Sequence, residues 1–374
     1  MRKAVLFLFI VILQVNAQPT EGIYKLRSID SLLSKEVEFI LDKRIADKRV
    51  IFLGEAEHHI GSDFLSKTQF IKYLVTKHGF RDIAFEGDFF ALYHEHDQKN
   101  LFPIWSKSTQ CQDLFNFLKE HNVTIWGFDN QFSSVFSFRN FSPLLFEFLT
   151  SNGIPYETTF KTHVNNVMKS GPKMNRELNE KEIATLLDNL DSLLLNSTVL
   201  ENHFWKQALE SFQSLVRQYN SNRKLGIEIR DRQMASNLNF LTVKMKDRKF
   251  LVWAANAHIS KLNLPEMKNQ TMGYQYLMAN PNITYHIAFS SIKMPYRKVK
   301  FIEQQKNDPD NLLSLLPSLS DNYFIDAKTI KDGNISFKEK RFEGMFGLGL
   351  NKTNYFDHFD ALIFIANGEK STTK

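Results

Sequence analysis

The chain has 374 residues, of which 43% are hydrophobic and 24% are charged, and its formal net charge is +6. This length and composition suit one large globular domain or two smaller ones. The positive charge is spread along the chain without a block of Lys and Arg between aromatic residues, which argues against nucleic acid as a partner. The single cysteine, Cys111, excludes an intrachain disulfide, so the fold depends on its hydrophobic core.

Residues 1–17 have the pattern of a signal peptide. Two basic residues precede an apolar stretch over 4–15 that is short for a membrane span, and the small residues before Gln18 suit a signal peptidase. We therefore expect residues 18–374 to form the mature protein, exported to the periplasm or the extracellular space without stable membrane insertion after cleavage. An N-terminal membrane anchor is the alternative interpretation of this segment.

Short apolar runs alternate with helical patterns along the rest of the chain. A strand is predicted over 48–55, followed by a helix from Ser62 to about His78. The segment over about 155–245 has the amphipathic stripes of helices. This alternation predicts an α/β fold, in which a mostly parallel sheet is flanked by helices and a helical insertion lies between the third and fourth strands. The remaining strands are predicted over 81–88, 123–131, 248–259, 283–291 and 360–367.

Ionisable or polar side chains follow the ends of the first four predicted strands. Ligands bind outside the carboxyl ends of parallel strands, so we expect these side chains to meet at one rim of the sheet. A single Glu or His at such a place is more often a helix cap or a packing residue, but the coincidence over four strands favours a site. The residues are Glu55 and His58 at the first strand, Glu86 at the second, Asp129 at the third, and Asn256 and His258 at the fourth.

Arg230 is a further candidate, in the stretch GIEIRDRQMASNL over 226–238. The pattern predicts that Arg230, Asp231 and Arg232 lie at the start of a helix. Arg230 could pair with a carboxylate of the rim, hold a substrate oxygen, or belong to a solvated charge cluster. The spacing alone does not choose among these roles.

The stretches LGEAEHH, GFRDIAFEGD, RDRQMASNL and VWAANAHI together resemble the erythromycin esterase-like family, in the same order and over most of the chain. That family has a G-E-x-x-H motif after its first strand, a second strand that ends in Glu, an R-D-x-x-M-x-x-N helix and a W-x-H-N-x-H segment. The resemblance implies an α/β fold and a hydrolytic site in which the motif histidine, His58, is the general base. It also assigns Glu55, Glu86, the second segment histidine His258, and the basic Lys67 to that site.

The sequence departs from the family pattern at three positions, which makes it a divergent member. Ala255 replaces the first histidine of the W-x-H-N-x-H segment, and Glu57 stands where Thr or Ser is common. His59 stands where Gly is usual, and is a candidate to replace the missing imidazole. These changes bear on the substrate and on whether catalysis persists in the family's form.

Together, these features predict hydrolysis of a small-molecule ester or lactone, with no cofactor and no covalent enzyme intermediate. His58, held by Glu55, would take a proton from water, Lys67 or His258 would stabilise the oxyanion, and Glu86 would position water or share a proton. The predicted substrate-binding residues are Asp129, Arg230, His59 and Asn256. Two alternatives stay open: a non-catalytic ligand-binding protein, and a hydrolase or peptidase in which Glu55, His58, Glu86 and His258 bind Zn²⁺ or Mn²⁺.

Overall fold

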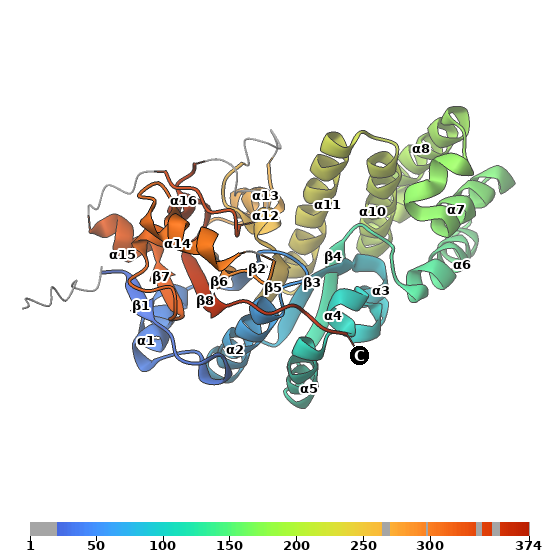
Figure 1. Cartoon of the computed structure of the whole chain (residues 1–374). Coiled ribbons are helices and arrows are strands. Elements are labelled where there is room, and N and C mark those ends of the chain that lie inside the picture. Colours follow the sequence, from blue (N-terminus) through green and yellow to red (C-terminus); the bar gives the residue numbers. More distant parts are fainter. Residues whose placement is uncertain (1–20, 264–269, 297, 334–338, 346–351, 374) are drawn as a thin grey trace, which may run out of the picture.

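The computed structural model describes residues 21–263, 270–296, 298–333, 339–345 and 352–373 (Figure 1). The predicted signal peptide, residues 1–17, lies outside the described residues. Within the described ranges, every helix is too short or too polar to cross a membrane.

The described residues form an eight-stranded sheet with the strand order β1-β7-β8-β6-β2-β5-β3-β4. The strands from β8 to β4 in this order run parallel, whereas β7 runs antiparallel to both β1 and β8. The predicted α/β class with a mostly parallel sheet is therefore confirmed. The strands are β1 (Ile23–Lys25), β2 (Val50–Glu55), β3 (Asp82–Asp88), β4 (Thr124–Asp129), β5 (Phe250–Ala255), β6 (Thr284–Lys293), β7 (Tyr323–Asp326) and β8 (Ala361–Asn367).

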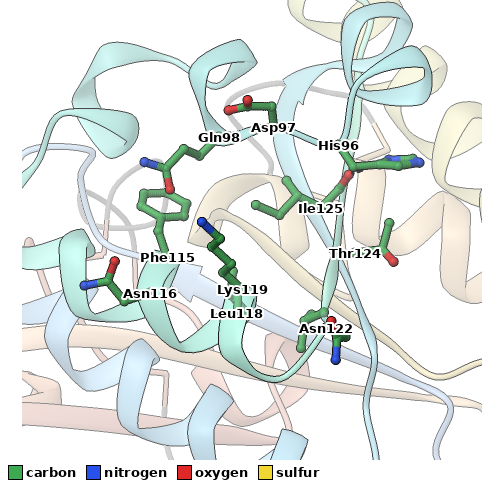
Figure 2. A pocket seen from close by; sticks show the side chains of 11 residues that line it. His96, Asp97, Gln98, Phe115, Asn116, Leu118, Lys119, Asn122, Thr124 and Ile125 are labelled. Carbon is green, nitrogen blue, oxygen red and sulfur yellow. Dashed lines mark hydrogen bonds between the residues drawn. The ribbon is translucent and has the colours of Figure 1, made fainter.

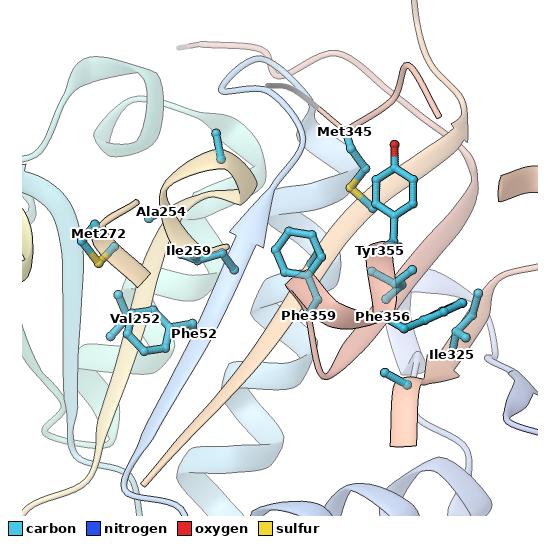
Figure 3. Packing of buried hydrophobic residues seen from close by; sticks show 14 of the residues in the cluster. Phe52, Val252, Ala254, Ile259, Met272, Ile325, Met345, Tyr355, Phe356 and Phe359 are labelled. Carbon is cyan, nitrogen blue, oxygen red and sulfur yellow. The ribbon is translucent and has the colours of Figure 1, made fainter. Parts of the chain in front are cut away.

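Helices cover both faces of the sheet, which is why the central strands are apolar on both sides. In β2, Val50 and Phe52 pack into one hydrophobic layer, and Ile51 and Leu53 pack into the other. Figure 3 shows Phe52 in the first of these layers, which also holds apolar residues of α11, α13, α15 and α16. The opposite layer holds apolar residues of α1, α2, α4 and α5.

The helices connect the strands and build one additional lobe. The α-helices are α1 (Lys35–Ile45), α2 (Gly61–His78), α3 (Phe89–His94), α4 (Pro103–Ser106), α5 (Gln112–Glu120), α6 (Val135–Ser151), α7 (Thr158–Ser170), α8 (Glu180–Leu194), α9 (Ser197–Glu201), α10 (His203–Tyr219), α11 (Arg223–Lys244), α12 (Asn256–Ile259), α13 (Met272–Ala279), α14 (Val299–Asn307), α15 (Ala327–Asp332) and α16 (Tyr355–His358). The 3₁₀ helices are η1 (Ile29–Ser31), η2 (Gln98–Asn100), η3 (Thr109–Cys111), η4 (Gly171–Arg176) and η5 (Leu312–Leu315).

The inserted helices between β4 and β5 have a hydrophobic core of their own, formed by residues of α6 to α10 together with Phe90 of α3. In Figure 1 this lobe stands to one side of the sheet, and α11 lies between the sheet and α10 of the lobe. The helical run begins at Val135, earlier than the predicted residue 155. The difference is α6, a Phe-rich helix at the start of the insertion that lies before the predicted boundary.

Two details of the predicted elements are wrong. Strands β1 and β7 were not predicted, because runs of three and four residues are too short to show a period of two. Arg230 does not lie at a helix start, because α11 begins at Arg223, where the side chain of Asn222 caps the helix by accepting from the amide of Leu225. Arg230 therefore projects from the interior of a long, rigid helix.

Candidate active site

The predicted rim is formed by four strands that are neighbours in the sheet, β2, β5, β3 and β4. Glu55 and Asp129 are the last residues of β2 and β4, and Glu86 lies near the end of β3. His258 lies on α12, which follows β5 directly. The strand order thus places four chemically active side chains, distant in sequence, at one edge of the sheet.

A bulge at the end of β3 directs Glu86 toward β5. The pairing of β3 with β4 shifts register between Phe85 and Asp88, and a Cβ atom at Gly127 would lie 2.5 Å from the carbonyl oxygen of Asp88. Glycine is therefore needed on β4 for the bulged backbone to approach so closely. In this position Oε2 of Glu86 accepts a 3.0 Å hydrogen bond from the backbone amide of Ala255.

Glu55 is fully buried and accepts three hydrogen bonds from side chains. Nδ1 of His58 lies 2.6 Å from Oε1, Nε1 of Trp105 donates to the same oxygen at 3.2 Å, and Nζ of Lys67 donates to Oε2 at 2.9 Å. Glu55 is therefore fixed in position by partners on α2, on α4 and on the loop that follows β2. Trp105 was not predicted as part of the site, since nothing in its local sequence points toward Glu55.

The imidazole of His58 is 41% exposed at its side chain and is the accessible member of this group. Burial opposes its protonation, but the hydrogen bond to Glu55 and the charge of Glu86 outweigh burial and raise the pKa of His58 to about 9. Nε2 of His58 has no protein partner in the described part of the chain. That nitrogen is the atom through which His58 can exchange a proton with solvent or a substrate.

Lys67 is fully buried, so the predicted role as an oxyanion donor does not fit its position. Its ammonium group binds Glu55 and lies 3.6 Å from the ring centroid of Trp253. Burial lowers the pKa of Lys67, while the charge of Glu55 acts in the opposite direction. Lys67 therefore holds Glu55 in place, and its side chain is not exposed to solvent.

Arg230 joins Glu86 and Asp129. Its Nε and Nη2 atoms bind the two oxygens of Asp129 at 3.0 and 2.7 Å, and Nη2 also lies 2.7 Å from Oε1 of Glu86. The side chain of Arg230 is 17% exposed and both carboxylates are buried. Pairing with the carboxylates of the rim, one of the predicted roles, is thus observed, and a solvated charge cluster is not.

Glu86 is an ionised carboxylate in this setting. Burial favours its neutral form, but the charges of His258, Arg230 and His58 outweigh burial and hold the pKa of Glu86 well below its usual range. This lowered pKa argues against the predicted sharing of a proton by Glu86. Glu86 instead supplies a fixed negative charge that both imidazoles of the site face.

His258 forms a second carboxylate–imidazole pair, with a partner that was not predicted. Nδ1 of His258 lies 2.7 Å from Oδ1 of the buried Asp231, while Nε2 lies 3.4 Å from both Glu86 and Arg230. Burial opposes the charge on His258, but Asp231 and Glu86 outweigh it and raise its pKa. The sequence feature that could have identified Asp231 is its position next to Arg230 in the R-D-x-x-M-x-x-N stretch.

Two predicted substrate-binding residues lie apart from this cluster. The side chain of His59 is exposed and makes no hydrogen bond within the described ranges. Asn256 is fully buried, and its Nδ2 donates to the carbonyl of Phe289 and to Sδ of Met345. A Cβ atom at Gly54 would lie 2.0 Å from Oδ1 of Asn256, so glycine makes room for a packing residue there. Asp129, a third predicted substrate-binding residue, lies within the cluster, where it is buried and both of its carboxylate oxygens accept from Arg230.

The described side chains do not form a group of three or more His, Cys, Asp and Glu residues that could hold a metal ion. The guanidinium of Arg230 lies between Glu86 and Asp129, where its positive charge satisfies both carboxylates. Nδ1 of His58 contacts Glu55, and Nδ1 of His258 contacts Asp231. The donor set predicted for Zn²⁺ or Mn²⁺ is thus divided into pairs that already have partners.

The C-terminal segment holds the loop that carries His58. The amide of Ser371 donates to the carbonyl of His59, and the amide of Gly61 donates to the carbonyl of Glu369, both at 2.8 Å. Lys370 forms an antiparallel bridge with Ile60. The segment continues toward α4 (Figure 1), and the side chain of Gln110, on the neighbouring η3, bonds to Glu369, Lys370 and Thr372. The His58 loop therefore lies between α2 and a strap from the end of the chain.

A large cavity, of about 660 Å³, lies away from this cluster (Figure 2). It is lined by the C-terminal part of α5, the segment 96–98 and the first residues of β4, Thr124 and Ile125. Asp129, at the other end of β4, belongs to the rim described above. The cavity of Figure 2 therefore opens at the amino end of an edge strand, and the side chains of the ionisable cluster do not line it.

Comparisons with known proteins agree with this architecture. The family model described as erythromycin esterase matches residues 75–367, a span that includes Glu86, Arg230 and His258 and begins after His58. YbfO of Bacillus subtilis (strain 168), provisionally named a hydrolase, is 25% identical over 281 residues. That alignment covers 63% of this chain and 61% of YbfO, so the chain spans less than two thirds of its relative.

Solved structures with the same fold include proteins of low sequence identity. A protein from Bacillus cereus superposes with a TM-score of 0.74 at 17% identity, covering 94% of this chain and 97% of that one. A succinoglycan biosynthesis protein gives 0.73 at 16% identity, with 94% and 96% covered. A mutant of the erythromycin esterase EreC in its open conformation gives 0.70 at 15% identity, with 94% and 98% covered.

Proposed function

The chain belongs to the erythromycin esterase family, and on that premise we propose that it is a hydrolase that cleaves a small-molecule ester or lactone with water activated by His58. The single observation that carries the proposal is the 2.6 Å contact between Nδ1 of His58 and Oε1 of Glu55. Because Oε1 of Glu55 accepts a hydrogen bond from Nδ1–H of His58, the neutral ring presents Nε2 as a proton acceptor. The ring is also the most exposed part of the ionisable cluster.

In the proposed reaction, Nε2 of His58 takes a proton from water as the water oxygen attacks the carbonyl carbon. The carboxylate of Glu55 stabilises the imidazolium that forms, and Lys67 and Trp105 keep that carboxylate in place. The tetrahedral adduct then collapses, and the imidazolium gives its proton to the leaving oxygen as the C–O bond breaks. Because the nucleophile is water, no covalent intermediate with the enzyme arises. General-base assistance of this kind contributes a factor of roughly 10²–10⁴ in rate.

His258 and Arg230 are the proposed donors to the oxyanion. The side chains of His258 and Arg230 are 12% and 17% exposed. Nε2 of His258 and Nη1 of Arg230 lie 3.4 Å apart. Asp231 and Glu86 raise the pKa of His258, which favours the charged, donating form of the ring. One such donor contributes a factor of about 10²–10³ to the rate of acyl transfer.

The test is turnover on a panel of p-nitrophenyl esters and of lactones with increasing ring size. We expect His58→Asn to lower kcat by roughly 10²–10⁴ on any substrate that the unaltered protein cleaves, with the fold intact by circular dichroism. His203→Asn, an exposed histidine on α10 in the helical lobe, is the matched control. Full activity of His58→Asn would contradict the mechanism, and binding of panel members without turnover would favour a ligand-binding protein.

Export is a separate part of the proposal, supported by the basic residues and the apolar stretch at the start of the chain. Cleavage after Ala17 would release a mature protein into the periplasm or the extracellular space. N-terminal sequencing of the protein recovered from those compartments tests it: a mature chain that begins at Gln18 is expected, and an intact Met1 would contradict cleavage.

A further inference from the structure

A second cavity, of about 430 Å³, opens at the amino ends of the parallel strands, opposite the rim that carries His58. Thr284, the first residue of β6, and Asp360, which precedes β8, belong to its lining. Arg44 near the end of α1 and Asp326 at the end of the antiparallel β7 complete its inner part. This cavity and the candidate active site are therefore separated by the length of the sheet.

Positive charge predominates in this cavity. Five basic side chains line it against two carboxylates. The lysines at its outer edge have partners of their own, since Lys48 contacts Asp47 and Lys328 contacts Asp332. Within the lining, Arg44 pairs with Asp326 and Lys261 pairs with Asp360 at 2.5 Å, so three lysines remain in excess of the lining carboxylates. The basic residues are Lys43, Arg44, Lys48, Lys261 and Lys328, and the carboxylates are Asp326 and Asp360.

Arg44 is held in a fixed position with one end free. Its Nε and Nη2 atoms bind Asp326 at 3.0 and 2.6 Å, and Nη2 also donates to Oγ1 of Thr329. Nη1 has no hydrogen-bond partner within the described part of the chain. Because Asp326 is fully buried and fixes the guanidinium plane, the two N–H groups of Nη1 need no reordering to meet an acceptor.

Tyr285 supplies the independent observation that an acceptor is missing. The residue is 4% exposed, lines the cavity, and has a buried hydroxyl group without a hydrogen-bond partner in the described residues. Buried hydroxyl groups are nearly always paired, and an unpaired one is costly. Burial, with Asp326 and Asp360, raises the pKa of Tyr285 well above its ordinary value of 10, so the group stays a neutral O–H donor.

We propose that this cavity binds a small anion through a phosphate or carboxylate group, whose oxygens accept from Nη1 of Arg44 and from the hydroxyl of Tyr285. Lys43, which has no ion-pair partner among the described residues, adds positive charge around the bound group. The cavity is larger than an inorganic phosphate ion, and Leu277 gives it one apolar wall, which suits an anion with an organic part. The proposal is independent of the hydrolytic function proposed for the opposite rim.

Isothermal titration calorimetry on the full-length folded protein tests the proposal, with inorganic phosphate, pyrophosphate and citrate as probes and with NaCl holding the ionic strength constant. We expect saturable one-to-one binding of at least one probe. Tyr285→Phe removes one donor to a charged group and should weaken that binding about tenfold. Lys43→Glu should weaken it several-fold, and Lys181→Glu, the same charge change on the distant α8, should not change it.

The outcomes separate the possibilities. Preference for phosphate or pyrophosphate identifies a phosphate site, and preference for citrate identifies a carboxylate site. Absence of saturable binding of all three probes would overturn the proposal, as would equal affinity of the unaltered protein and Tyr285→Phe. Circular dichroism and thermal unfolding in anion-free buffer verify that Tyr285→Phe is folded. If it is not, Lys43→Glu decides, because Lys43 is an exposed residue and unchanged binding there would overturn the site.

Discussion

His58 and Glu55 are joined by a 2.6 Å contact between Nδ1 and Oε1, formed within a single turn at the end of β2. The carboxylate lies in the protein interior and the imidazole lies at its surface. A ring held in this way has one nitrogen committed to the protein and one available to react. The same arrangement recurs between His258 and Asp231, where the ring is more buried.

The pH dependence of activity should follow His58. A base with a pKa raised to about 9 is mostly protonated at neutral pH, so kcat/KM should rise with pH, reach half of its maximum near pH 9 and level off above that pH. The pH–rate profile of the unaltered protein measures this rise in kcat/KM. A plateau already reached at pH 7 would contradict it.

The contribution of His58 to the free energy of unfolding should fall as the pH rises. A folded-state pKa above the ordinary value of 6.5 means that protonation favours the folded protein. This contribution is fully present below about pH 6.5 and is lost as the pH rises through about 9. Unfolding by urea across this range, compared with His58→Asn, measures it, and equal pH dependence of the two proteins would contradict it.

Arg230→Met should destabilise the protein strongly. The substitution leaves Glu86 and Asp129 buried without their shared partner, and breaking a buried pair in this way costs about 3–5 kcal/mol. Arg232→Met is the matched control, since the exposed Arg232 forms its one ion pair among the described residues with Glu228, on the same helix at 3.3 Å, and should cost less than about 0.5 kcal/mol. Urea unfolding gives both values. Similar losses for the two variants would mean that the buried network contributes little.

Removal of divalent metal ions should leave hydrolysis unchanged. The guanidinium of Arg230 already satisfies Glu86 and Asp129, and each imidazole already binds a carboxylate. Turnover after dialysis against EDTA, compared with mock-dialysed protein, is the measurement. Loss of activity that returns with Zn²⁺ or Mn²⁺ would instead support the metal-dependent alternative.

Truncation after Gly368 should lower kcat more than it changes KM, if the proposed function holds. The strap formed by residues 369–373 binds the backbone on both sides of Ile60, so its loss should loosen the loop that carries His58. Hydrogen exchange of the amides over residues 57–63 reports this loosening without reference to activity. Unchanged exchange in the truncated protein would show that the strap does not hold the loop.

The sequence by itself determined the elements and the edge of the sheet on which the site lies. Period-two and period-3.6 patterns are local properties of the chain, so they predicted the central strands and the helical insertion. Because polar residues followed four strand ends, the rim at Glu55, Glu86, Asp129 and His258 could be predicted before the strand order was known.

Only the tertiary structure decided which of these side chains contact each other. The partners of His258 and Glu55, Asp231 and Trp105, come from distant elements whose proximity depends on strand order and helix packing, which no local pattern contains. Burial decided the roles of Lys67 and Asn256 for the same reason, since the solvent exposure of a side chain depends on what packs over it. Residue type and spacing specify what chemistry is available, whereas long-range packing decides which atoms are close enough to carry it out.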